Sequence, residues 1–104
     1  PQVTALIARA RQAVEESQVA PPLDLVPRIA ENDGDLDARF ALAEHYVDQK
    51  AWAPALEQLL EIVRRDRTFR DDIGRKTMIE VFGKASAQPQ LVAEWRRRLS
   101  SVLF

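Results

Sequence analysis

The sequence has no cysteine and contains only one histidine and three glycines in 104 residues. Without cysteine it cannot form a disulfide framework, a thiolate zinc site or a redox-active thiol pair. The single imidazole, His45, leaves no histidine cluster for a metal, and the isolated glycines form no phosphate-binding loop. No apolar run reaches the ~18 residues of a membrane-spanning helix, and no signal-peptide pattern is visible. We therefore expect no cofactor, no metal and no membrane contact.

An excess of either charge is also absent, because 15 basic residues oppose 16 acidic ones. A general nucleic-acid binder should carry a basic excess, so nucleic acid is not an expected partner. The charge is unevenly distributed, however: residues 1–50 have a net charge of −4 and residues 51–104 have +3. Two interpretations stay open: solvated faces of opposite average sign, or a basic C-terminal surface that meets an acidic partner.

Apolar residues recur at intervals of three and four, and no segment alternates as a strand does. Pro21-Pro22, the turn at 32–35 and Pro89 separate the periodic segments. The pattern predicts six helices joined by short links, which makes consecutive helices antiparallel neighbours. Their expected ranges are 3–17, 25–32, 36–49, 53–65, 72–83 and 90–103.

The same pattern predicts which residues cap the helices and which side chains face the core. Asp24 and Asp35 are the expected N-caps of the second and third helices, and Asp71 or Asp72 that of the fifth. Gly83 is the expected end of the fifth helix. We also expect apolar residues of the short helix to face the core, namely Val26, Ile29 and Ala30.

Residues 35–69 resemble one tetratricopeptide repeat, a pair of helices with a period of about 34 residues. In that repeat, small and large side chains alternate so that two helices pack tightly and the next pair stacks on them. The matching residues are Leu42-Ala43, Tyr46, Trp52, Ala55 and Leu59. Two positions depart from the pattern: Arg39 stands where the repeat usually has Trp, and Arg67 where it usually has Pro.

The flanking segments have the length and apolar stripes of weaker copies of the repeat. We predict a degenerate first hairpin at 1–34, the best-matching repeat at 35–69, and a degenerate last hairpin with the C-terminal helix at 70–104. In the last hairpin Phe82 takes the role of Tyr46. The expected fold is all-α: one domain, a right-handed tetratricopeptide-repeat-like superhelix of about six antiparallel helices.

The chain also resembles the C-terminal helical region of the bacterial thioredoxin-like co-chaperones called chaperedoxins (the YbbN/CnoX type). The resemblance runs from about residue 24 to the last residue, and Asp33-Gly34 departs from the Pro-acidic pair usual there. The similar stretches are Ile29–Asn32, Ala55–Leu60, Gly74–Thr77 and Trp95–Phe104.

This resemblance implies a cytoplasmic protein-binding domain without catalytic activity. An N-terminal thioredoxin-like domain would precede Pro1, and any redox activity would reside there. The helical region would bind unfolded clients, a GroEL-type chaperonin, or both. Because the chain does not begin with Met, we expect it to be a segment of a longer protein.

The last helix holds the candidate partner-binding residues Arg96, Arg97, Arg98 and Phe104. Arginines beside apolar residues make effective partner anchors, because the guanidinium stacks and pairs with carboxylates at little cost in hydration. The alternative is an ordinary solenoid cap with one packed face and one charged face. Trp95 and Leu99 lie on the stripe that we expect to be packed.

Other functions have weaker support. His45 has no catalytic partner near it in the sequence, and adjacent acids on a helix point about 100° apart, so they make no general acid–base pair. A Lys–Asn clamp for a chaperone tail is not supported, because Asn32 is the only asparagine. RNA readers would need base-reading pairs in many repeats. A generic docking or self-association scaffold, and a structural part of an enzyme, remain as alternatives.

Overall fold

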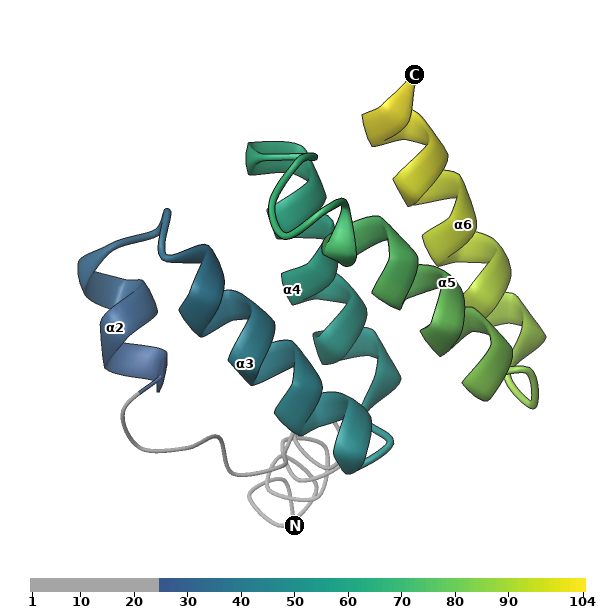
Figure 1. Cartoon of the computed structure of the whole chain (residues 1–104). Helices are drawn as coiled ribbons and strands as arrows, with labels where there is room; N and C mark the ends of the chain where they lie inside the picture. The colour runs from purple at the N-terminus through teal and green to yellow at the C-terminus, as the bar shows by residue number, and fades with distance from the viewer. Residues whose placement is uncertain (1–24) are drawn as a thin grey trace, which may run out of the picture.

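The computed structural model describes residues 25–104, and that part of the chain consists of five α-helices and no strand. This confirms the all-α prediction. Figure 1 shows the helices following one another across the molecule in chain order. The helix expected over 3–17 and the cap expected at Asp24 lie outside the described residues. The helices are α2 (Leu25–Glu31), α3 (Leu36–Asp48), α4 (Trp52–Arg65), α5 (Ile73–Lys84) and α6 (Pro89–Leu103).

The observed bounds differ from the expected ones by a residue or so, but the expected end at Gly83 is wrong. Helix α5 continues through Gly83 to Lys84 and is capped at Ala85, whose N–H donates to the Val81 carbonyl at 2.8 Å. A glycine ends a helix when the chain must turn left-handed. Gly83 keeps a negative φ, so nothing stops the helix there.

The turn between α2 and α3 confirms the cap predicted at Asp35. The carboxylate accepts a hydrogen bond from the Ala38 N–H at 3.0 Å and pairs with Arg28 at 3.1 Å. The hydrogen bond from Ala38, and then Arg28, lower the pKa of Asp35 below its ordinary value. Asn32 Oδ1 accepts from the Gly34 N–H at 3.0 Å, which closes the turn.

The face predicted for α2 is largely wrong. Leu25 is the buried residue of this helix, and Ile29 is half-buried against Leu42 and its neighbours. Val26 is 46% exposed and Ala30 is also exposed. Two turns of helix can bury only one narrow side, and here that side runs through Leu25 and Ile29.

Helices α3 and α4 form a closely packed antiparallel pair. Small residues allow the close approach, because Ala43 and Ala55 are both fully buried. Burial raises the pKa of Tyr46, and the Glu57 carboxylate of α4 adds to the effect. Tyr46 and Ala55 therefore lie on neighbouring helices, as predicted.

Arg39, which stands at the usual Trp position, is buried in this pair. Its Nε donates to the Asp33 carbonyl at 2.8 Å and its Nη1 to Gln58 Oε1 at 2.9 Å. Hydrogen bonds thus tie the α2–α3 turn to α4, where a tryptophan would have filled space. A buried arginine needs such partners, because an unpaired one would carry a large desolvation cost.

Helix α5 packs against α4 through a close approach at Gly74. A Cβ at Gly74 would lie 3.0 Å from Cγ2 of Val63 and 3.1 Å from Cγ2 of Ile62. Met78 and Val81 continue the contact and are fully buried in one cluster with the apolar residues of α4. Asp72 occupies the predicted N-cap position, but its backbone is left-handed and its carboxylate pairs with Arg75 instead of capping the helix.

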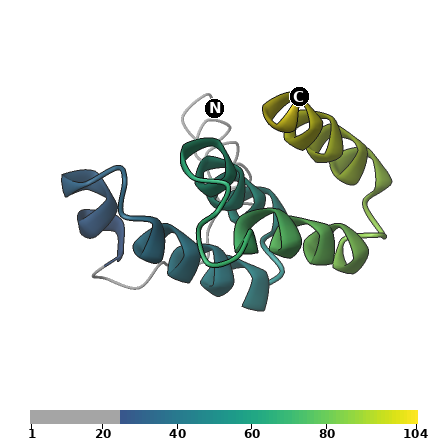
Figure 2. The ribbon, with the colours of Figure 1, turned by 45° about the horizontal axis from the view of Figure 1, so that its top comes forward.

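Helix α6 completes the core without closing onto α5. Trp95 and Leu99 are 8% and 7% exposed, so both are packed as predicted. In Figure 2, however, α6 stands away from α5 beyond the loop that joins them, and its closer packing is with α4. Within residues 25–104 no helix has the length and apolar character needed to span a bilayer.

Candidate functional site

The sequences of the two described hairpins can be aligned by pairing Tyr46 with Phe82, and the aligned positions differ in side-chain size where the second hairpin is splayed. It matches the buried Leu59 with the buried Trp95. It also matches Ala43 with Ile79, and Ala55 with Leu91. Two small, buried residues of the first hairpin thus have bulky counterparts in the second hairpin. Larger side chains hold two helix axes further apart.

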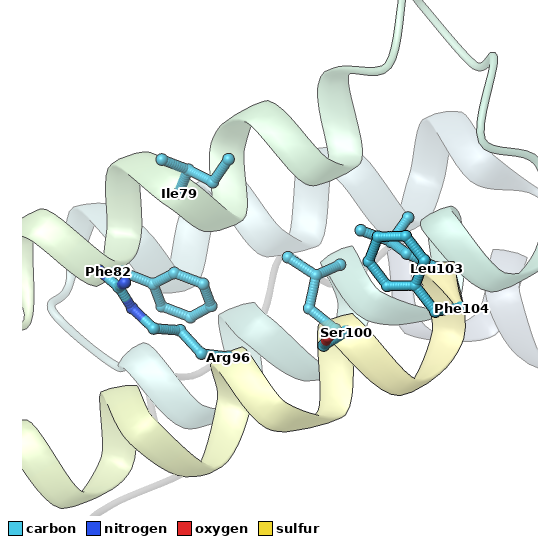
Figure 3. A pocket seen from close by; sticks show the side chains of 7 residues that line it. Ile79, Phe82, Arg96, Ser100, Leu103 and Phe104 are labelled. Atoms are coloured by element: carbon cyan, nitrogen blue, oxygen red, sulfur yellow. The ribbon is translucent and has the colours of Figure 1, made fainter.

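The splay leaves an apolar groove between α5 and α6, which we call the α5/α6 groove. Its volume is about 300 Å³. Figure 3 shows Phe82 and Arg96 together at one end, and Leu103 with Phe104 at the other. The groove is lined by Ile79 and Phe82 of α5 and by Arg96, Leu99, Ser100, Leu103 and Phe104 of α6 and its end.

Two of the three large apolar side chains exposed in residues 25–104 belong to this groove. Phe104 is fully exposed and Ile79 is 50% exposed. The third, Val26, lies on α2 in the other half of the molecule. Apolar groups that converge on one concave surface are typical of a binding site, whereas scattered ones are ordinary.

Arg96 supplies the charge of the α5/α6 groove. Its guanidinium carbon lies 5.4 Å from the centre of the Phe82 ring, a cation–π arrangement. Within residues 25–104 no carboxylate lies within ion-pair distance of Arg96. The residue is exposed, so its positive charge is available to a ligand carboxylate.

The four candidate residues of the last helix therefore separate into two groups. Arg96 and Phe104 line the groove, whereas Arg97 and Arg98 do not. Arg98 is held elsewhere, since it pairs with Glu94 at 2.7 Å and lies 4.5 Å from the centre of the Trp95 ring. Arg97 is exposed outside the groove.

Ile79 is a groove residue that was not among the candidate contact residues expected from the sequence. The signal was present in the sequence. In the pairing of the two hairpins Ile79 stands at the small-residue position of Ala43. A large residue at a position that needs a small one marks a place where the helices cannot close.

A second depression of about 260 Å³ lies between α3 and α5 and has the opposite character. Its floor contains Phe40, Val47 and Ile73, and its rim is mostly acidic. The charged residues are Glu44, Asp48, Glu80 and Lys84. We call this depression the α3/α5 cleft. An acidic ligand would be repelled there and attracted by Arg96 in the α5/α6 groove.

The described part of the chain contains no cluster of side chains suited to a metal. His45 is half-buried, with its ring 6.0 Å from the ring of Tyr46. Residues 25–104 contain no group of three His, Asp or Glu side chains that could hold a metal ion.

Comparison with known families agrees with the helical pairs. A tetratricopeptide repeat family model matches residues 15–104, which is most of the chain. The chain belongs to the tetratricopeptide repeat family. Searches of curated proteins and of solved structures found no match. Tetratricopeptide repeats generally mediate protein–protein interaction, so the role of this domain is protein binding.

Proposed function

We propose that this tetratricopeptide repeat domain is the client- and chaperonin-binding part of a thioredoxin-like bacterial co-chaperone, located in the cytoplasm. Support comes from the similarity of residues 24–104 to that family's helical region. The observation that carries the proposal is the α5/α6 groove, which is lined by the exposed Phe104 and Ile79 and by Arg96. No carboxylate of residues 25–104 forms an ion pair with Arg96. Unfolded clients offer apolar segments to such a surface.

The proposal assigns no reaction to this domain. Any redox chemistry would belong to a thioredoxin-like domain on the N-terminal side. The domain would hold a client, or the rim of a GroEL-type chaperonin, through contacts of α6. Arg96, Arg97 and Phe104 are the proposed contact residues. Arg98 has a smaller part, because its guanidinium is already engaged by Glu94 and Trp95.

The test is capture of a purified GroEL-type chaperonin, and separately of a chemically unfolded test protein, by the immobilised chain. We expect Arg96→Glu with Arg97→Glu to abolish capture, because it reverses the charge of the exposed side of α6. The matched control is Arg64→Glu with Arg65→Glu on α4, which reverses two exposed arginines away from the groove. Equal capture by both double variants would reject α6 as the contact.

A generic docking scaffold is the alternative assignment. It is distinguished by selectivity, because it would capture neither the chaperonin nor unfolded protein while still binding a specific folded partner. Absence of capture by the unmodified chain, together with a circular dichroism spectrum that shows folded helices, would favour this alternative.

A further inference from the structure

The first hairpin shows what occupies the groove of a helical pair in this molecule. Helix α5 packs on α4 with Gly74 against Val63, and it shares one buried cluster with Ala43. As a result Ala43 is fully buried and Val63 is 2% exposed. The element that covers the first hairpin is thus an amphipathic helix with a small residue at its point of closest approach.

The position of Ala43 is not covered in this way in the second hairpin. Its counterpart Ile79 is 50% exposed, whereas Leu99, the counterpart of Val63, is 7% exposed and lines the α5/α6 groove. The second hairpin therefore offers an apolar surface of the kind that a helix covers in the first hairpin. Helix-in-groove binding uses an apolar stripe at i, i+3, i+4 and i+7.

The charge at the α5/α6 groove indicates which charge a helix bound there would carry. Arg96 stands where the first hairpin has Leu60, which is 7% exposed and part of the apolar core. The exchange places beside the Phe82 ring a cation that pairs with no carboxylate of residues 25–104. A guanidinium in such surroundings pairs strongly with a carboxylate, because part of its hydration is already replaced by the ring.

From these observations we propose that the α5/α6 groove binds an acidic amphipathic helix of a partner protein. Its apolar stripe contacts Ile79, Leu99 and Leu103, and a carboxylate beside the stripe pairs with Arg96. The proposal rests on the protein-binding function proposed above and adds the conformation and charge of the bound segment. An extended segment, a basic helix or a second copy of the chain would contradict it.

The probe is a stapled, fluorescent helical peptide of about 15 residues, with leucines at i, i+3, i+4 and i+7 and glutamates flanking the stripe. A matched peptide carries lysines in place of the glutamates, and an unstapled proline-containing peptide of the same composition stays extended. Binding is measured by fluorescence anisotropy at low and high salt. We expect the acidic helix to bind about tenfold more tightly than either control peptide.

The variants of the chain replace exposed side chains, in the groove and, as controls, outside it. Arg96→Glu should weaken the acidic probe about tenfold and strengthen the lysine probe. Arg64→Glu, the same charge change on α4 away from the groove, should change the binding of neither probe by more than about twofold. Ile79→Ser should weaken both helical probes. Its control is Val26→Ser, a similarly exposed apolar residue on α2. Since both positions are at the surface, the variants should keep the unmodified melting curve.

The result that supports the proposal is the reversal of probe preference by Arg96→Glu but not by Arg64→Glu. Binding that is insensitive to Arg96 and Ile79 would overturn it, as would equal binding of the extended peptide. A dimer measured by light scattering that dissociates with Ile79→Ser would also overturn it, because a second copy would then fill the groove. Chaperonin capture without probe binding would reject this proposal alone, and probe binding without capture would reject the co-chaperone assignment alone.

Discussion

The two described hairpins follow the same repeat pattern but differ in how closely their helices pack. In the α3–α4 pair Ala43 and Ala55 are fully buried at the helix crossing. In the α5–α6 pair their counterparts are Ile79 and Leu91, and the helices are splayed. The first pair has its surface covered by α5, whereas the second keeps the α5/α6 groove open to solvent. The two hairpins thus differ at two positions, where alanine in the first is replaced by a bulky residue in the second. The first hairpin contributes to the stability of the fold, whereas the second also offers a binding surface.

The comparison also separates residues whose substitution should lower stability from residues whose substitution should weaken binding. Residues of the covered surface contribute stability, because their removal leaves a cavity. The exposed residues of the open groove, Ile79 and Phe104, contribute binding instead, because truncating them leaves no buried cavity. Substitutions at equivalent positions therefore test the comparison directly.

The largest effect is expected from Leu59→Ala in the covered hairpin, where the side chain is fully buried. The loss of packing and the cavity should reduce the free energy of unfolding by about 2–5 kcal/mol, measured by urea denaturation followed by circular dichroism. Ile79→Ala in the open groove should change it by less than about 0.5 kcal/mol. Similar costs for the two variants would show that the groove is not open.

A second large effect is expected at the contact between α4 and α5. Gly74→Leu would force side-chain atoms against Val63, Ile62 and the Leu59 carbonyl, all within 3.3 Å of a Cβ at that position. We expect a loss of about 1–3 kcal/mol from this overpacking. Gly83 has no atom within 4 Å of a Cβ, so Gly83→Ala should instead stabilise the helix by about 0.5–1 kcal/mol. Thermal unfolding curves distinguish these opposite signs.

Ala55→Leu gives the first hairpin the residue that the second hairpin has at the aligned position, Leu91. We expect a loss of about 1–3 kcal/mol, because Ala55 is fully buried and α3 cannot move away without uncovering Leu42 and Ala43. An unchanged melting temperature would contradict the alignment of both hairpins, since the small-residue position would then have no structural meaning.

The smallest effect concerns the turn before α3. The pKa of Asp35 is lowered, first by the hydrogen bond from the Ala38 N–H and then by Arg28. The stabilisation is therefore complete above the ordinary carboxyl pKa and disappears as the pH falls through the lowered value. Asp35→Asn keeps the capping oxygen but removes the charge. The difference in stability between wild type and variant should be constant well above the ordinary carboxyl pKa of 3.8 and should shrink as the pH falls below it. A difference that stays constant at low pH would show that the charge of Asp35 does not contribute to stability.

Much of the fold follows from the sequence, because the periodic apolar residues of α3, α4 and α6 match the observed buried faces. Local rules failed where tertiary packing decides the outcome. Gly83 stays helical since its φ is never forced positive, and Asp72 gives its carboxylate to Arg75 instead of the helix end. The exposure of Val26 follows from how α2 is placed on α3, which its seven residues alone do not determine.

The candidate site was predictable in part. The sequence pointed to α6 and to Arg96 and Phe104 as contact residues. It could not separate them from Arg97 and Arg98, because adjacent arginines differ only in the direction that the folded helix gives them. The groove itself depends on the distance between α5 and α6. Ile79 and Leu91 hint at that distance, but only the packed structure fixes it.

The most direct test of the open groove is isotope-edited NMR of the methyl-labelled chain with the acidic helical probe. We predict intermolecular nuclear Overhauser effects from the probe to the methyl groups of Ile79 and Leu103, and none to those of Leu59 or Val63 beneath α5. Contacts to Val47 and Ile73 in the α3/α5 cleft, in place of contacts to Ile79, would contradict the account.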